Sequence, residues 1–494
     1  MSAPAPPDPT AEPPNLLFVL TDDQGAWARG AVTPEFRTPV LDRLAAEGTV
    51  LDRFFCASPV CSPARASLLT GRLPSAHGIH DWLRPGAVAP GPQGDLLAGV
   101  PTYPELLAGS GYRCAHVGKW HVGSSAAPAP GFEHWYAHRL GGGPYRDAPI
   151  WAMDAATGRP EAPAREAVEP RYFTDALGDE AVSFLRGHVA AADPRPFLLQ
   201  IATTAPHDPW TGGNHPEELL ALYGDTDFPS VPDPEPHPWL RRDAWAGPLA
   251  DRRAHLAGYA AAVSGVDRML GGVLEELGEL GLLDSTIVLF LSDNGFSCGH
   301  HGIWGKGNGT WPLNFWEDSI RVPFLAWGPG RIAAGRVRED LVSATSLLET
   351  LLELAGVTAP PDPLRGGRSV AALLREDGTA DGPAPVPGAE VLILDEYGDN
   401  RMLRTERWKL VLRRRGPTEL YDLSSDPGER HDLSADPGHA DVRAALAERL
   451  HAAFAPRTTT AADGWELAVS GDGQTGPLDG STPGPFAQRP DAPA

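Results

Sequence analysis

The sequence Cys61-Ser62-Pro63-Ala64-Arg65 stands in the N-terminal part of a chain of 494 residues. Its pattern, C-x-P-x-R, predicts the start of a short helix, because the first helical turn tolerates proline. The free N–H groups and partial positive charge of the helix N-terminus would then point toward the site that contains the cysteine. Taken alone, the pattern also fits a buried thiol beside a turn proline.

Two apolar segments far apart in the chain each end in polar residues. The segments cover residues 15–20 and 286–291, and such continuous apolar runs are typical of parallel strands buried on both faces. The polar residues that follow them are Asp22, Asp23, Asp293 and Asn294. Because open α/β sheets form their sites at the carboxyl ends of strands, we expect these four side chains to gather with Cys61 around one cation.

The expected ligands are carboxylate and amide oxygens, which suit Ca²⁺ or Mg²⁺ better than Zn²⁺. The Asp22-Asp23 pair alone could equally cap a turn. Its combination with the second acidic segment favours a metal site.

Together these features resemble the type I, formylglycine-dependent sulfatases of the alkaline phosphatase superfamily, over roughly residues 15–433. Ala64 stands where the family usually has serine, a variation that the family accepts. The resemblance implies that a formylglycine-generating enzyme converts Cys61 to formylglycine, whose hydrate is the nucleophile and a metal ligand. It favours Ca²⁺ over Mg²⁺. It also implies an α/β fold with a large mixed, mostly parallel sheet sandwiched by helices.

The string G-K-W-H-x-G at residues 118–123 contains Lys119 and His121. The two residues lie two positions apart on a strand-like segment, so we expect both to face the same side. By resemblance, Lys119 contacts the sulfate. His121 would bind the nucleophile and remove the proton whose loss expels sulfate.

Two further strings, A-P-H-x-P at residues 205–209 and G-K-G at residues 305–307, match the family. The resemblance implies that His207 and Lys306 bind a sulfate oxygen and protonate the leaving alkoxide. It implies that Arg65 steadies the hydrate. Residues 308–319 make a longer connection than is usual, so we expect the pocket wall to differ there.

Other aromatic and basic residues suggest weaker assignments. Adjacent histidines rarely bind one ion, so we expect His300 and His301 to form loop hydrogen bonds. Residues that could stack on a sugar or aryl ring, although core packing is their default, are Trp82, Trp135, Trp151 and Trp210. Arginines that hint at a sulfated carbohydrate are Arg84, Arg139 and Arg146.

Composition excludes several classes of function. Hydrophobic residues make up 42% and charged residues 21%, as in an ordinary soluble globular protein. The net charge of −23 disfavours nucleic acid and anionic membranes as partners. The four cysteines show no metal-finger spacing. Residues 1–14 lack the basic and apolar parts of a secretory signal, and we expect a cytoplasmic protein.

We predict four segments along the chain. These are a disordered lead (residues 1–14), a catalytic domain (15–375), a smaller domain of antiparallel sheet plus helix (376–455) and a mostly flexible tail (456–494). Within them, we expect a pocket-wall loop at residues 132–152 and one strand at residues 322–327.

Three functions fit these features. The leading hypothesis is hydrolysis of a sulfate monoester, either a sulfated carbohydrate or an aryl sulfate. The alternative is hydrolysis of a phosphonate monoester or phosphodiester by the same nucleophile. A non-catalytic sulfoglycan-binding protein with an unconverted Cys61 is the third, and it is disfavoured because every expected catalytic position is filled. The oligomeric state stays open.

Overall fold

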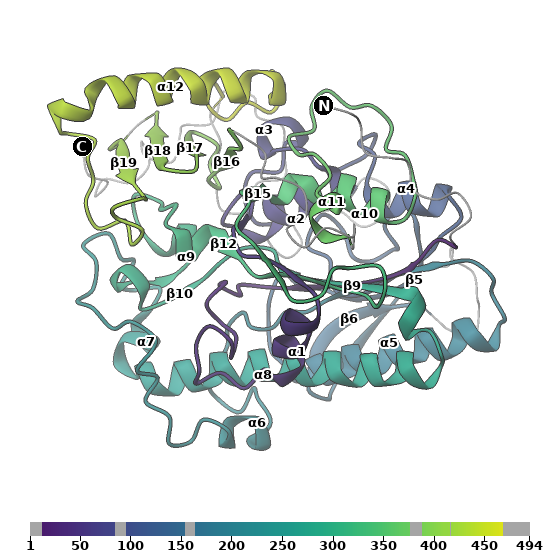
Figure 1. The fold of residues 1–494 in the computed structure, drawn as a ribbon. Helices are drawn as coiled ribbons and strands as arrows, with labels where there is room; N and C mark the ends of the chain where they lie inside the picture. The colour runs from purple at the N-terminus through teal and green to yellow at the C-terminus, as the bar shows by residue number, and fades with distance from the viewer. Residues whose placement is uncertain (1–11, 84–94, 154–163, 376–387, 415, 468–494) are drawn as a thin grey trace.

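The computed structural model describes residues 12–83, 95–153, 164–375, 388–414 and 416–467 (Figure 1). The expected lead and tail lie largely outside these residues, as does the start of the predicted second domain at residue 376. The proposed domain boundaries therefore stay a prediction. No helix within the described ranges combines the length and apolar character that a membrane span needs.

A ten-stranded mixed sheet forms the centre of the molecule, which confirms the predicted fold class. In spatial order its strands are β14 (Arg336–Arg338), β2 (Thr49–Leu51), β13 (Phe324–Trp327), β9 (Thr286–Ser292), β1 (Asn15–Thr21), β8 (Phe197–Ala202), β4 (Arg113–Lys119), β5 (Phe132–His138), β6 (Ala148–Ala152) and β7 (Arg165–Glu169). The central strands β9, β1, β8, β4 and β5 are parallel to one another. Strands β13, β6 and β7 pair antiparallel with their neighbours.

Strand β1 is buried along its whole length because it contributes to a core on each face of the sheet. Leu16 and Phe18 belong to one core, and Leu17 and Val19 belong to the other. Side chains of a strand alternate between faces, so a sheet covered on both sides requires apolar residues at every position.

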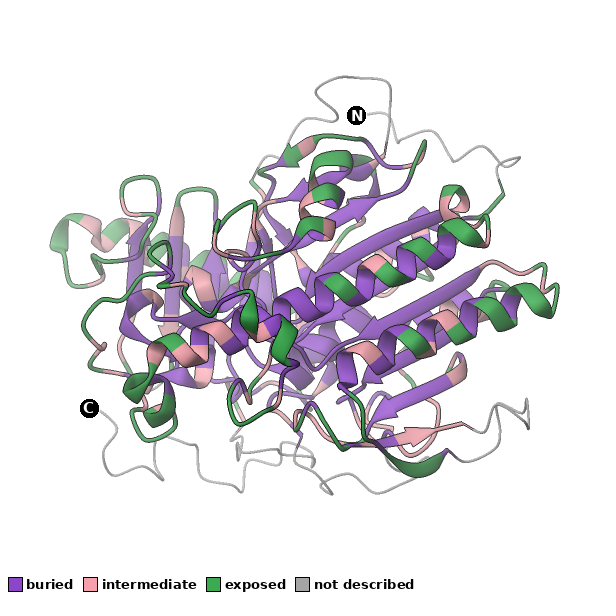
Figure 2. Cartoon of the chain, turned by 90° about the horizontal axis from the view of Figure 1, so that it is seen from below, coloured by how far each residue is buried: buried purple, intermediate pink, exposed green. Residues whose placement is uncertain are grey.

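Helices cover both faces of this sheet (Figure 1). One face is covered by α1 (Pro39–Glu47), α5 (Phe173–Ala190) and α8 (Arg252–Glu279), and the other by α2 (Cys61–Thr70), α4 (Tyr103–Gly109) and α10 (Leu347–Leu354). Figure 2 shows that the long helices bury one side against the sheet and expose the other. The shorter elements are β3 (Phe54–Phe55), α3 (Pro74–His77), α6 (Glu217–Ala221), α7 (Ala246–Ala250), β10 (Ser297–Cys298), β11 (Trp304–Gly305), α9 (Glu317–Ile320), β12 (Arg321–Val322), β15 (Val342–Ser343) and α11 (Ala371–Leu374).

A second, antiparallel sheet follows near the C-terminus, as predicted. It consists of β16 (Val391–Leu394), β17 (Asn400–Arg404), β18 (Trp408–Arg413) and β19 (Glu419–Asp422), with α12 (Ala440–Phe454) on one face (Figure 1). Leu410 packs in the core beneath α12, whereas its neighbour Val411 belongs to a core of the large sheet. One face of β18 therefore points toward the catalytic part of the chain.

Two sequence predictions about local structure are wrong. Residues 132–152 are not one loop, because they contain the strands β5 and β6, which pair antiparallel. The strand expected at residues 322–327 divides at Pro323, which has no N–H to donate to a sheet. Strand β12 pairs with β3, while β13 pairs with β9 and β2.

Candidate active site

The site lies where β1 and β9 end. These strands are parallel neighbours in which Thr21 lies opposite Ser292, so the residues that follow each strand emerge side by side. The side chains concerned, all at most 2% exposed, are those of Asp22, Asp23, Asp293 and Asn294.

Carboxylate oxygens of Asp22, Asp23 and Asp293 all lie within 4.8 Å of one another. Asn294 joins them, because its side-chain amide donates to Asp23 Oδ1 at 2.6 Å and its backbone N–H donates to Asp293 Oδ1 at 2.8 Å. Buried carboxylates this close together repel one another unless positive charge compensates them. The site therefore requires compensating positive charge, from basic side chains or from a metal ion.

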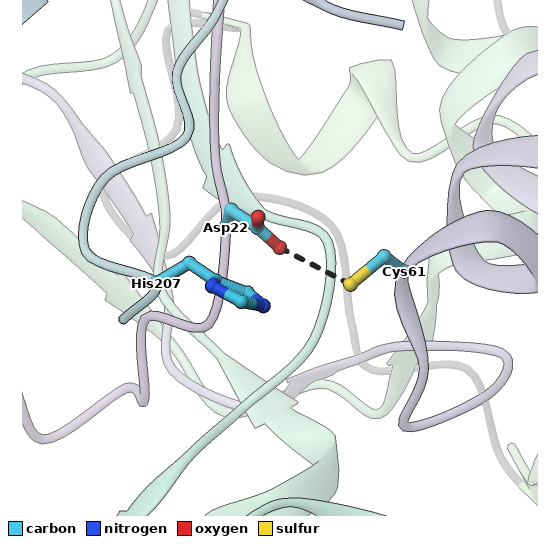
Figure 3. Close-up of side chains that lie close together, drawn as sticks. All are labelled: Asp22, Cys61 and His207. Atoms are coloured by element: carbon cyan, nitrogen blue, oxygen red, sulfur yellow. Dashed lines mark hydrogen bonds between the residues drawn. The ribbon is translucent and has the colours of Figure 1, made fainter. Parts of the chain in front are cut away.

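Cys61 is the first residue of α2 and faces this cluster. Its thiol donates to Asp22 Oδ1 at 3.3 Å, and Asp22, Cys61 and His207 meet from three separate segments (Figure 3). Burial, followed by the charge of Asp22, raises the pKa of the Cys61 thiol to about 12. The thiol is therefore neutral at physiological pH and a weak nucleophile.

Three basic side chains pair with the three carboxylates. Arg65 lies one turn along α2 from Cys61, and its Nε donates to Asp293 Oδ2 at 2.8 Å. Lys119 pairs with Asp22, and Lys306 with Asp23. Lys306 Nζ also donates to Cys61 Sγ at 2.9 Å.

These ion pairs change the ionisation of the groups. Burial opposes the charge of Lys306, but Asp23 and the other anions outweigh it and raise the pKa of Lys306 well above its ordinary value. Burial, then the charge of Asp22, raises the pKa of Asp293 to about 6. Lys306 thus remains charged inside the site.

His207 lies at the open side of the cluster, with its side chain 24% exposed. Its Nε2 is 3.8 Å from Asp23 Oδ2. Burial lowers the pKa of His207, but Asp208, Asp22 and Asp23 together outweigh burial and raise it above the ordinary value. His207 can therefore carry a proton into the site.

His121 reaches the site differently from the sequence prediction. Strand β4 ends at Lys119, and His121 has a left-handed backbone with φ of 58°. The predicted alternation of a strand therefore does not explain how Lys119 and His121 both reach the site. Its Nε2 lies 2.9 Å from the carbonyl oxygen of Leu83, and its Nδ1 has no hydrogen-bond partner within the described residues. A carbonyl only accepts, so Nε2 carries the proton of this bond and Nδ1 is a free base. Burial, then Lys119, lowers the pKa of His121 well below its ordinary value.

A cavity of about 360 Å³ opens onto these residues. Besides Asp23, Cys61, His121, His207 and Lys306, it is lined by Val60, Trp82, Leu83, Leu140, Gly141, Gly142, Asp208, Trp245, Phe296 and Asn308. The Gly-rich turn after β5 and the lengthened connection that begins at residue 308 thus both contribute residues to the cavity wall. They lie within residues 132–152 and 308–319, the two regions in which the sequence predicted parts of a pocket wall. Trp245 and Phe296 were missed, because single aromatic residues carry no positional signal.

Of the aromatic candidates, only Trp82 lines the cavity within the described residues. Trp135 and Trp210 are buried in the two cores. His301 stacks on Trp316 at 4.5 Å, and neither it nor His300 joins a metal-ligand cluster among the residues described.

Two of the three arginine candidates lie away from the cavity. Arg139 pairs with Glu166 and Arg146 is exposed, whereas Arg84 lies outside the described residues. The described part of the cavity wall contains no arginine.

Gly141 provides a test of the position of His121. A Cβ atom at Gly141 would lie 2.1 Å from His121 Nε2, closer than any real contact. We expect Gly141→Ala to displace the imidazole and to lower kcat by about 10-fold or more, because a misplaced catalytic group loses much of its effect. Steady-state kinetics with 4-nitrophenyl sulfate would measure this.

Gly272→Ala is the matched control, since its added Cβ has no atom within 4 Å apart from its chain neighbours and the backbone of its own helix. Equal activity of the Gly141 and Gly272 variants would contradict the assigned position of His121.

Sequence comparison identifies relatives of the chain. Residues 14–357 match the family described as Sulfatase, and residues 300–455 match the family described as N-sulphoglucosamine sulphohydrolase, C-terminal. The chain is 33% identical to N-acetylgalactosamine-6-sulfatase of Canis lupus familiaris over 370 residues, which cover 71% of this chain but only 64% of the length of that enzyme. It is 30% identical to arylsulfatase A of Homo sapiens over 449 residues, covering 85% of this chain and 83% of that enzyme.

Solved structures share the fold. A protein solved in complex with its substrate D-glucosamine-2-N,6-O-disulfate superposes with a TM-score of 0.73 at 24% identity, over 92% of this chain and 99% of that one. A phosphonate monoester hydrolase of Agrobacterium radiobacter superposes with a TM-score of 0.66 at 22% identity, over 90% and 96%. At these identities the likeness concerns the fold alone. On the sequence matches, the chain belongs to the sulfatase family of enzymes, within the alkaline phosphatase superfamily.

Proposed function

We propose that this chain hydrolyses a sulfate monoester to an alcohol and inorganic sulfate, with a formylglycine made from Cys61 as the nucleophile. The observation that carries the proposal is the convergence of buried carboxylates, basic side chains and Cys61 at the carboxyl ends of β1 and β9. A formylglycine-generating enzyme is the partner that this maturation requires.

The oxygen cluster fits a hard divalent cation. Asp22, Asp23, Asp293 and Asn294 would hold it together with position 61. The three carboxylates offer oxygens within 4.8 Å of one another, and oxygen donors favour Ca²⁺, with Mg²⁺ as the alternative. When bound, the cation would lower the pKa of the nucleophile and neutralise charge on the sulfate.

Calcium binding predicts a stability effect that does not depend on activity. Ca²⁺ at 100 times its dissociation constant should stabilise the folded chain by about 2.7 kcal/mol and raise its melting temperature. The Asp293→Ala variant should show no such increase. Differential scanning fluorimetry with and without Ca²⁺ would measure both proteins, and a similar increase in the two would contradict the ligand assignment.

The side chains of the protein divide the remaining work. Lys119, Lys306 and Arg65 supply positive charge around one tetrahedral anion, which is the electrostatic stabilisation that the reaction requires. His207, whose pKa is raised, can bind a sulfate oxygen and donate its proton to the leaving oxygen, and Lys306 can assist. His121 lines the same cavity as position 61, and its Nδ1 has no partner among the described residues, so it is the proposed acceptor of a proton from position 61.

The cavity wall favours a substrate with one sulfate on an apolar or ring-shaped group. Beyond the catalytic residues, the described wall consists mainly of Val60, Trp82, Leu83, Leu140, Trp245 and Phe296. Aromatic faces stack on aryl rings and on sugars. The net charge of −23 opposes long polyanionic chains. An aryl sulfate or a singly sulfated sugar therefore fits best.

A matched substrate panel tests the proposed reaction. We expect 4-nitrophenyl sulfate to be hydrolysed with a higher kcat/KM than the 4-nitrophenyl ester of phenylphosphonate. The reverse preference would overturn the proposal in favour of the phosphonate monoester or phosphodiester hydrolase, whose fold this chain shares. Binding of sulfated glycans without turnover of either ester would favour the non-catalytic alternative.

A further inference from the structure

A buried amide holds the loop that carries Lys306. Asn314 is fully buried, and its side-chain Nδ2 donates to the carbonyl oxygen of Lys306 at 2.9 Å and to Thr310 Oγ1 at 3.0 Å. The backbone N–H of Asn314 donates to the carbonyl oxygen of Gly307 at 3.1 Å. Asn314 thus fixes the backbone at and directly after Lys306, although it does not touch the reacting atoms.

The C-terminal sheet holds the residues on either side of Asn314. Arg413 of β18 donates to the carbonyl oxygen of Leu313 at 2.6 Å. Lys409 of the same strand donates to the carbonyl oxygen of Phe315 at 3.0 Å. Because residues 409, 411 and 413 share one face of a strand, both cations point toward the Lys306 loop together with Val411.

These two cations are fully buried and depend on specific anions. Lys409 lies 2.7 Å from Glu317 Oε1 and 2.5 Å from Glu429 Oε1, and its side chain is 0% exposed. Arg413 lies 2.5 Å from Glu419 Oε1, and its side chain is also 0% exposed. Buried ion pairs contribute little net stability, because desolvation offsets their attraction. The hydrogen bonds that Lys409 and Arg413 donate to backbone carbonyl groups instead fix the geometry of residues 313–315.

We infer that Asn314, Lys409 and Arg413 form a clamp through which the C-terminal sheet positions Lys306 for catalysis. The three are positioning residues, since they act through the backbone of the Lys306 loop. The catalytic half of this inference rests on the proposed function of Lys306. The C-terminal sheet is then a part of the active-site scaffold as well as a separate packing unit.

The test compares Asn314→Ala with Asn15→Ala. Asn15 is also buried and bonds to the backbone N–H of Phe197, but it lies at the opposite end of β1 from the site. Amide hydrogen exchange should be about 10-fold faster in residues 305–316 of the Asn314 variant. Without the side-chain hydrogen bonds of Asn314, local opening of this segment requires less free energy. The Asn15 variant should leave exchange in this segment unchanged.

Kinetics supply the second readout. We expect Asn314→Ala to lower kcat by about 10-fold or more, with a smaller change in KM. The ratio of kcat for phenyl sulfate to kcat for 4-nitrophenyl sulfate should shift in the same direction as in Lys306→Ala. A merely structural defect would lower both rates in proportion, as expected for Asn15→Ala.

The outcomes separate the two proposals. Unchanged exchange in residues 305–316 of Asn314→Ala would overturn the clamp, whatever the activity. Faster exchange with an unchanged kcat ratio would overturn its catalytic part. A wild-type protein that hydrolyses neither sulfate ester would overturn the proposed function, while the exchange data would still decide whether the clamp exists. Lys409→Arg, which keeps the buried charge, should preserve more activity than Lys409→Met.

Discussion

Replacing Cys61 with alanine should lower kcat for 4-nitrophenyl sulfate by roughly 10⁴-fold or more, because loss of a catalytic nucleophile removes most of the rate enhancement. The variant should fold, since Cys61 packs at the start of α2 and alanine suits a helix. Circular dichroism and steady-state kinetics would measure the two effects separately.

Cys114→Ala is the matched control for Cys61→Ala. Cys114 is equally buried, but it lies on β4 and its thiol points to the carbonyl oxygen of Pro104. We expect this variant to lose stability without a large loss of kcat. Substantial sulfatase activity in Cys61→Ala would exclude position 61 as the nucleophile.

The second large effect concerns Lys119 and His207. Lys119→Ala removes the cation that pairs with buried Asp22, and we expect kcat to fall by about 10²–10³-fold, as for other removed electrostatic groups. His207→Ala removes a proton donor, which is worth about 10²–10⁴-fold. Rates measured with phenyl and 4-nitrophenyl sulfate would distinguish the two variants.

In His207→Ala, hydrolysis of phenyl sulfate should slow more than hydrolysis of 4-nitrophenyl sulfate. The phenolate that leaves phenyl sulfate is more basic than 4-nitrophenolate and depends more on proton donation. Lys119→Ala should affect both esters alike. A near-normal kcat in either variant would contradict the role given to that residue.

The sequence predicted the two strands that carry the site because β1 and β9 consist almost entirely of apolar residues. Residues 15–20 and 286–291 were predicted to form strands buried on both faces, and they lie in β1 and β9. The gathering of Asp22, Asp23, Asp293 and Asn294 followed, since parallel neighbours deliver their next residues to one edge. The helix predicted for the smaller domain is α12 (Ala440–Phe454).

Features that depend on distant contacts could not be predicted in this way. Nothing in the string around Lys119 shows that β4 ends there and that His121 has a positive φ. Strand β5 was missed because polar and aromatic residues mix along it, and its burial depends on α5 and β4. The bond between Arg413 and the carbonyl of Leu313 joins residues far apart in the chain, and neither residue type suggests it.

The most direct test of this account is tandem mass spectrometry of the peptide that spans position 61. The protein would be coexpressed with a formylglycine-generating enzyme and purified. The purified preparation would first be shown to hydrolyse 4-nitrophenyl sulfate. We predict an aldehyde in place of the Cys61 thiol, with Cys56 unmodified in the same digest. An intact thiol at position 61 throughout such an active preparation would contradict the proposed nucleophile.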